Sequence, residues 1–332
     1  MTQTIMEIEA RQAPLIIQNQ LRANQVQVQR IGNKLRDIKP TMVMIVGRGS
    51  SDHAGVFGKY LIEIEAGIPA FSAAPSVTSV YGKQLKLEHA LVIVISQSGR
   101  SPDILAQAKM AKSAGAYCIA LVNDETSPLK DIVDDILPLK AGEERSVAAT
   151  KSYLATLSAL LQLTAYWTHN QVLISALERL PQSMQDIIDS PAQLTPQSID
   201  GVMNMVVLGR GLGFAVAKEM ALKLKEVSSI HAEAFSSAEF LHGPVTLVEQ
   251  GLAILNSAVD DESADSHQKQ IDEVEQRGAL LIHLRQTEID IHPRLASLLV
   301  LQRFYLDVAD VAVSRGFNPD EPKGLKKVTR TI

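Results

Sequence analysis

The chain has 332 residues, of which 46% are hydrophobic and 21% are charged, and its formal net charge is −5. These values are typical of a globular protein with room for two domains, and the negative balance argues against a nucleic-acid partner, which requires a basic face. No hydrophobic run reaches the roughly 18 residues of a membrane span, and the start, MTQTIMEIEARQ, lacks the features of a signal peptide.

Five short apolar runs in the first half of the chain predict buried strands. They lie at 41–47, 68–73, 90–96, 116–122 and 134–139, with helical patterns between them. This alternation is typical of a parallel sheet that helices cover on both faces. The fourth run contains the single cysteine, Cys118, which excludes an internal disulfide and a cysteine-built zinc site. We interpret Cys118 as a core residue and expect a cytoplasmic protein.

The strand and helix pattern restarts after a segment rich in Pro and Ser at 190–201. MIVGRGSSDHAGVFGKYL (44–61) is matched by MVVLGRGLGFAVAKEMALKL (205–224). Similarly, 90–101 and 113–122 are matched by 251–263 and 276–285. We therefore predict an α/β protein with two tandem domains, 1–190 and 191–332. Each is expected to be a five-stranded parallel sheet flanked by helices, doubly wound as in flavodoxin.

Small polar side chains gather where the third predicted strand meets a helix, in SQSGRS (96–101). Ligands of open parallel sheets bind beyond the carboxyl ends of strands, where helix N-termini attract anions. Gly99 would allow close approach of the backbone, and GRGSS (47–51) supplies a second such corner. Ordinary helix capping by Ser101 is the alternative. Two corners in one repeat, against Asp260, Asp261 and Glu262 in the other, favour a phosphate site.

A second candidate group lies in ALKLKEVSSIHAEAF (221–235), where Lys223 and Glu226 are three residues apart on one predicted helix face. Such a pair is ordinarily a surface ion pair. His242, before Gly-Pro, would ordinarily be an exposed histidine of a turn, and Lys327 a solubilising residue of the C-terminal tail.

Several stretches taken together resemble the sugar isomerase (SIS) family, in particular the isomerase half of glucosamine-6-phosphate synthase. They are GRGSSDHAG, SQSGRSPD, VAATKS (147–152), ALKLKEVSSIHAEAF, EFLHGP (239–244) and GLKKVT (324–329), and they span almost the whole chain in order. The resemblance implies an aldose–ketose site for a phosphorylated sugar, shared between the subunits of a homodimer. It also implies that no metal or organic cofactor is needed.

The resemblance also implies roles for individual residues. The residues implied to bind the sugar phosphate are Ser50, Ser51, Ser96, Gln97, Ser98 and Ser101. Val147 and Ala148 would line the sugar through backbone groups. Glu226 would be the base that moves a proton between C1 and C2, with Lys223 beside it, and His242 would open the ring from the partner subunit. Lys327 would act from the C-terminal tail.

Two positions depart from the synthase. Arg48 stands where the synthase has cysteine, and Ala149 stands where it has serine. Arg48 would either add charge for the phosphate or brace the turn, so its place among the substrate-binding residues has two interpretations. The resemblance therefore does not decide how the sugar is contacted near Arg48 and Ala149.

The expected reaction follows from a comparison with the synthase, which draws ammonia from an N-terminal glutaminase domain with a catalytic cysteine. This chain begins with a short helical pattern, and its one cysteine lies in a strand. We therefore expect a glucosamine-6-phosphate deaminase that forms fructose 6-phosphate and ammonia. Alternatives are a galactosamine-6-phosphate deaminase, a fructosamine-6-phosphate deglycase or another phosphosugar isomerase. A non-catalytic sugar-phosphate sensor is a further alternative, but it would not need Glu226, His242 and Lys327 together.

Overall fold

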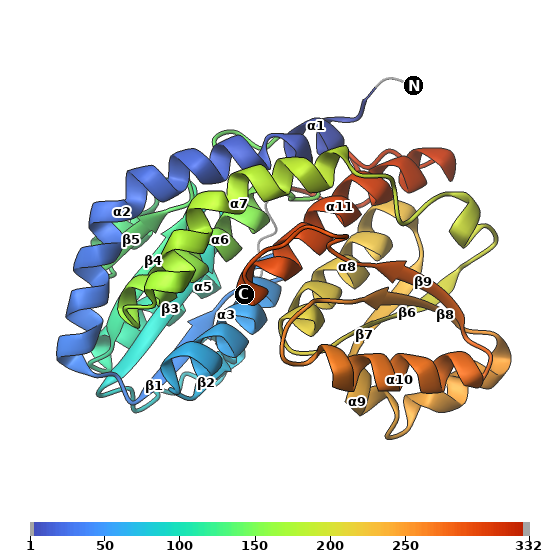
Figure 1. Ribbon diagram of the computed structural model, residues 1–332. Helices are drawn as coiled ribbons and strands as arrows, with labels where there is room; N and C mark the ends of the chain where they lie inside the picture. The colour runs from blue at the N-terminus through green and yellow to red at the C-terminus, as the bar shows by residue number, and fades with distance from the viewer. Residues whose placement is uncertain (1–2, 328–332) are drawn as a thin grey trace. The chain divides into compact units, whose positions relative to one another are not determined.

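The computed structural model describes residues 3–327, which form two compact units (Figure 1). The first unit comprises Leu15–Glu143 and Lys151–Glu178. The second comprises residues 3–14, Glu144–Thr150 and Arg179–Lys327. The division of the sequence into domains 1–190 and 191–332 stays a prediction. Across the described residues, no helix combines the length and hydrophobicity that crossing a membrane requires.

The first unit is built on a five-stranded parallel sheet in the order β2-β1-β3-β4-β5. The strands are β1 (Met42–Val46), β2 (Ala70–Ser72), β3 (Ala90–Ser96), β4 (Tyr117–Val122) and β5 (Asp135–Pro138). In the register of the sheet, Val46 of β1 lies opposite Val94 of β3. All five apolar runs predicted as strands in this half form strands, which confirms that part of the prediction.

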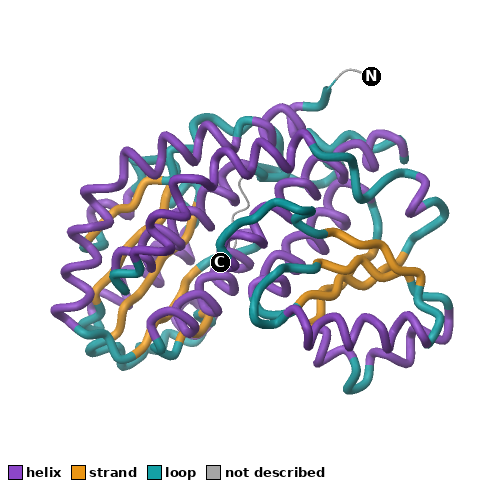
Figure 2. The backbone as a smooth tube through the Cα atoms, in the orientation of Figure 1, coloured by secondary structure: helices purple, strands orange, loops and turns teal. Residues whose placement is uncertain are grey.

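Helices cover both faces of this sheet, as Figure 2 shows in purple around the orange strands. The helices of this half are α2 (Ala13–Ile38), α3 (Ser50–Ala66), α4 (Pro75–Ser79), α5 (Pro102–Ser113), α6 (Lys151–Trp167), α7 (Gln171–Asp189) and the 3₁₀ helix η1 (Pro128–Asp131). On the α5 face, Ile104 and Ala108 pack in one hydrophobic cluster with Val92 and Cys118 of the sheet. Cys118 is fully buried, as predicted, and burial raises the pKa of its thiol to about 12.

The second unit is built on a parallel sheet in the order β7-β6-β8-β9. Its elements are α1 (Ile5–Arg11), η2 (Gln197–Ile199), β6 (Asn204–Gly209), α8 (Leu212–Ser228), β7 (His231–Ser236), α9 (Ser237–Phe240), η3 (Pro244–Gln250), β8 (Ala253–Ser257), α10 (Ala264–Gln276), β9 (Leu280–Leu284) and α11 (Pro293–Ser314). Helix α8 packs on one face with α11 against it, and α9 and α10 cover the other (Figure 1).

The prediction of tandem α/β domains is confirmed, but the expectation of five strands in each is wrong for the second. Within the described residues, its sheet has four strands. After β9 the chain runs through the polar segment RQTEIDIH (285–292), and Pro293 then begins helix α11. This segment has no apolar run long enough for a fifth buried strand.

The restart seen in the sequence is a structural repeat. The orders β2-β1-β3-β4 and β7-β6-β8-β9 correspond strand by strand. Gly49, at the start of α3, has φ 54° and ψ −128°, and Gly211, at the start of α8, has φ 52° and ψ −124°. Positive φ values of this kind favour glycine because it has no Cβ. The Gly-Arg-Gly sequence therefore makes the same strand-to-helix turn in both repeats.

Candidate functional site

A group of polar side chains lies beyond the carboxyl ends of β1 and β3, and we call it the donor corner. Its members are Ser50, Ser51, Ser96, Gln97, Ser98 and Ser101. Because β1 and β3 are neighbouring parallel strands, the loops 47–51 and 96–101 leave the same edge of the sheet. Arg48 Nε, from the first loop, lies 2.8 Å from Asp103 Oδ2 at the start of α5, and the Asp103 side chain is fully buried. This contact supports the interpretation of Arg48 as a brace of the turn, which it ties to the start of α5.

The second loop of the donor corner is held by its own hydrogen bonds. Ser96 Oγ accepts from the Gly99 N–H at 3.0 Å, and the Ser127 hydroxyl donates to the Gly99 carbonyl at 2.7 Å. Gly99 has φ 60°, and a Cβ there would overlap the Ser127 side chain. Glycine is therefore required at this position for the backbone turn and for the close approach of Ser127.

Several donors of the corner are not used by the rest of the described chain. The side chains of Ser51, Gln97, Ser98 and Ser101 are half-buried, and none has a hydrogen bond within residues 3–327. Ser101 is the residue before α5, but its side chain makes no capping hydrogen bond. Ordinary capping therefore does not account for Ser101. These groups can donate hydrogen bonds to an anion that approaches the start of α5.

The corresponding corner of the second repeat uses its polar groups internally. Asp261 accepts from the N–H and the hydroxyl of Ser263 at 2.8 and 2.5 Å. Arg294 donates to both carboxylate oxygens of Glu262, at 2.6 and 2.7 Å, and this hydrogen bonding lowers the pKa of Glu262 to about 2. The carboxylates at this corner disfavour an anionic ligand.

The predicted acid–base pair lies on helix α8. Lys223 Nζ is 2.6 Å from Glu226 Oε2 and 3.2 Å from Glu219 Oε1. The exposed fraction of the side chain is 1% for Lys223, 0% for Glu219 and 22% for Glu226. The alternative of a surface ion pair is therefore wrong, because Lys223 and Glu219 are buried. Of the three side chains, only that of Glu226 is partly exposed to solvent.

Neighbouring charges keep Lys223 protonated. Burial acts to lower the pKa of Lys223, but the carboxylates of Glu219 and Glu226 outweigh burial, and the pKa is raised. The Tyr305 hydroxyl, from α11, donates to Glu219 Oε1 at 3.3 Å. An ammonium beside a partly exposed carboxylate can stabilise an oxyanion while the carboxylate moves a proton. Glu219 could have been found from its i, i+4 spacing to Lys223, whereas no local signal marked Tyr305.

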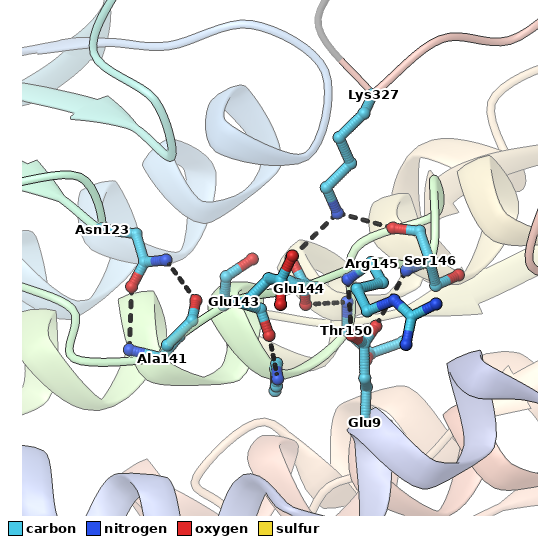
Figure 3. Close-up of polar contacts among 12 residues, drawn as sticks. Glu9, Asn123, Ala141, Glu143, Glu144, Arg145, Ser146, Thr150 and Lys327 are labelled. Carbon is cyan, nitrogen blue, oxygen red and sulfur yellow. Dashed lines mark hydrogen bonds and ion pairs between the residues drawn. The ribbon is translucent and has the colours of Figure 1, made fainter.

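The structure brings Lys327 to the loop that holds Val147 and Ala148 (Figure 3). Lys327 Nζ donates to the Ser146 carbonyl at 2.6 Å and lies 3.3 Å from Glu144 Oε2. Val147 is half-buried and Ala148 is buried. The sequence did not single out Glu144, although it lies just before VAATKS in the same loop.

His242 is placed apart from the other predicted catalytic residues. It is exposed in the turn after α9, and its N–H donates to the Glu239 carbonyl. Within residues 3–327, no hydrogen bond or ion pair joins the His242 side chain to Glu226 or Lys327. The described chain therefore joins Lys223 to Glu226 and Lys327 to the 144–150 loop, but it leaves His242 outside both groups.

His267 is a buried histidine beside α9 that the sequence did not single out. His267 of α10 has Nδ1 2.9 Å from Ser237 Oγ and Nε2 2.7 Å from Asn256 Oδ1. Burial, together with the positive charge of Arg210, lowers the pKa of His267 to about 4. His267 is therefore neutral at pH 7 and ties α10 to the first residue of α9 and to β8.

Comparison with known proteins gives matches over both repeats. Residues 35–166 and 200–300 match the SIS domain. Glutamine–fructose-6-phosphate aminotransferase (isomerizing) of Clostridium acetobutylicum is 33% identical over 310 residues, which are 86% of this chain and 51% of that protein. The chain thus spans about half the length of the curated relatives it matches.

Solved structures match along nearly the whole chain. A protein from Silicibacter pomeroyi DSS-3, provisionally described as a phosphosugar isomerase, has a TM-score of 0.90 and 35% identity over 96% of this chain and 100% of that one. The C-terminal domain of glucosamine-fructose-6-phosphate aminotransferase from Francisella tularensis has a TM-score of 0.83 and 25% identity. That match covers 97% of this chain and 99% of that one.

Proposed function

The chain belongs to the SIS domain family, and from this membership we propose that it is a phosphosugar enzyme, specifically a glucosamine-6-phosphate deaminase. Its products would be fructose 6-phosphate and ammonia. The observation that carries the proposal is the burial of Lys223 between Glu219 and Glu226, with the Glu226 side chain partly exposed. A sensor that only binds a sugar phosphate has no need of a buried acid–base pair, so this arrangement favours catalysis over sensing.

The phosphate of the substrate would bind at the donor corner. Its uncommitted hydroxyl and amide groups, with the N–H groups at the start of α5, can surround a dianion without a charged side chain. Arg48 would act indirectly, because its guanidinium is paired with the buried Asp103. Ser96 would support phosphate binding partly by holding the loop in place, since its side-chain oxygen accepts a hydrogen bond from the Gly99 N–H.

The proposed reaction needs ring opening, a proton transfer and a hydrolysis. His242 would move the proton that opens the ring, since an imidazole has one nitrogen that can donate a proton and one that can accept it. Glu226 would remove the proton from C2 of the open-chain amino aldose and return it to C1, while the Lys223 ammonium stabilises the oxygen at C1. Water would then add to the resulting C2 imine and ammonia would leave. One water is consumed for each ammonia and fructose 6-phosphate formed.

We further propose that His242 serves the site of a partner subunit in a homodimer. Its exposure in the turn after α9 supports this assignment, because a partner can reach it. Proton transfers and a hydrolysis can be completed by side chains alone, so we propose no metal or organic cofactor. The cytoplasm is the proposed location.

The direct test is incubation of the purified protein with glucosamine 6-phosphate, galactosamine 6-phosphate or a fructosamine 6-phosphate, with separate assays of ammonia and ketose phosphate. Equal yields of ammonia and fructose 6-phosphate from the first substrate would confirm the proposal. Turnover of only the second or third would identify the related deaminase or deglycase. Tight binding of all three without any product would instead indicate a sensor.

A further inference from the structure

We propose that Glu144 is a positioning residue, which holds the Lys327 ammonium against the 144–150 loop so that one N–H of Lys327 points to the substrate. This inference rests on the proposed function and on the family resemblance, which implies that Lys327 acts at the site from the C-terminal tail. Glu144 itself need not touch the substrate.

The contacts of Glu144 join two segments far apart in the sequence (Figure 3). Its Oε2 lies 3.3 Å from Lys327 Nζ, and its Oε1 accepts from the Thr150 N–H at 3.0 Å. Lys327 also donates to the Ser146 carbonyl at 2.6 Å. One carboxylate therefore fixes the end of the loop and the position of the ammonium together.

Lys327 is one of the partners of the buried Glu144 carboxylate. Its side chain is fully buried, whereas that of Lys327 is 26% exposed. Burial of a carboxylate is unfavourable unless opposite charge and hydrogen bonds compensate. The Lys327 ammonium contributes opposite charge to this carboxylate, so the pair favours the position of Lys327 beside the loop.

The remaining hydrogen-bonding capacity of Lys327 indicates what the docked tail can do. An ammonium has three N–H donors in a fixed tetrahedral arrangement. Within the described residues, two of them are directed to Ser146 and Glu144. The third is left for a ligand oxygen beside the loop of Val147 and Ala148. Since two contacts fix the nitrogen, the direction of the third N–H is fixed as well.

The loop has a second carboxylate that supports the same geometry. Glu9 of α1 accepts from the backbone N–H groups of Arg145 and Ser146, at 2.5 and 3.1 Å. Glu9 thus holds the backbone that presents the Ser146 carbonyl to Lys327. Because Glu9 binds only backbone in these contacts, substitution of Glu144 can be tested while this support of the loop is kept.

The test is the Glu144→Gln variant, which keeps the size of the side chain and an oxygen for Thr150 but removes the charge. Glu143→Gln is the matched control, because Glu143 is exposed and its contact with Lys151 uses the backbone carbonyl. With glucosamine 6-phosphate, we expect kcat of Glu144→Gln to fall about tenfold or more, the range of one charge-assisted hydrogen bond. KM should change little, because the donor corner is intact.

A double-mutant cycle separates positioning from a general effect on the fold. In a Lys327→Met background, Glu144→Gln should cause little further loss of kcat, since both substitutions remove the same contact. A full additional loss in that background, or an unchanged kcat of Glu144→Gln alone, would overturn the proposal.

Trypsin cleavage provides a readout that does not depend on turnover. Cleavage after Lys326 and Lys327, followed by mass spectrometry, should be faster in Glu144→Gln than in the wild-type protein and in Glu143→Gln. Equal rates in all three proteins would overturn the docking of the tail by Glu144. If the wild-type protein turns over none of the three sugar phosphates, the proposed function fails. The tryptic rates then decide the Glu144–Lys327 contact by themselves.

Discussion

Replacement of Glu226 by Gln removes the proposed base but keeps an oxygen that can accept from Lys223. The general base in a proton transfer contributes roughly 10²–10⁴-fold to the rate. We therefore expect kcat for ammonia release to fall at least about 100-fold. KM for glucosamine 6-phosphate should stay close to the wild-type value, because the donor corner, the proposed phosphate site, belongs to other loops.

The cost in stability should be small by comparison. Breaking a buried ion pair costs about 3–5 kcal/mol when one charge is left uncompensated. In Glu226→Gln, however, Lys223 keeps Glu219 at 3.2 Å, and the substituted side chain is 22% exposed in the native protein. The expected loss is therefore about 1 kcal/mol, the contribution of one hydrogen bond.

Lys223→Met is the contrasting variant. It removes the Lys223 ammonium from beside the fully buried Glu219, and we expect a loss of about 3–5 kcal/mol. Urea unfolding of both variants, with ammonia release measured on the folded protein, gives the two quantities separately. A normal kcat in Glu226→Gln would remove Glu226 from the mechanism. A loss of stability as large as that of Lys223→Met would show that Glu219 does not compensate Lys223 as the geometry implies.

The combined substitution Ser96→Ala and Ser98→Ala should raise KM for the phosphosugar at least about tenfold, since hydrogen bonds to charged groups contribute about 1.5–3 kcal/mol each; an unchanged KM would reject the donor corner. His267 binds a proton below about pH 6.5 in the unfolded chain but only below about pH 4 in the folded protein. The free energy of unfolding should therefore fall by about 3 kcal/mol as the pH is lowered from about 6.5 to about 4. Urea unfolding from pH 7 to 4 should show this slope, and His267→Gln should reduce it. Mixed dimers of inactive His242→Ala and Glu226→Gln subunits should regain activity, and mixed dimers that stay inactive would contradict a shared site.

Local sequence patterns were sufficient for the strands of the first sheet and for the repeat. The run 90–96, for example, was predicted as a strand and forms β3 with the same bounds. Near-continuous apolar runs have few alternatives to a buried strand in a parallel sheet. The corner 96–101 could be predicted for the same reason, because it follows directly from the end of that strand.

The burial of charged groups could not be predicted locally. Lys223 looked like a surface residue because its burial depends on α11, which packs against α8 from much later in the chain. The segment 190–201 stood out in the sequence only as a stretch rich in Pro and Ser between the repeats, yet Asp307 of α11 accepts from the N–H groups of Gln193 and Leu194. Arg303 of the same helix donates to the Ser190 carbonyl. In each case the deciding partner lies far away in the sequence.

Comparison of the two repeats distinguishes residues that the fold requires from residues that the proposed phosphate site requires. Gly49 and Gly211 have nearly the same dihedral angles, so both repeats keep the turn that opens a helix beyond the sheet. The side chains around the turn differ: in the first repeat Ser98 has no hydrogen bond within the described residues, whereas in the second the Ser263 hydroxyl is bound to Asp261. A donor already engaged with a carboxylate cannot also bind a phosphate without losing that bond. The proposed anion binding in the first repeat alone therefore rests on the side chains and not on the backbone that the repeats share.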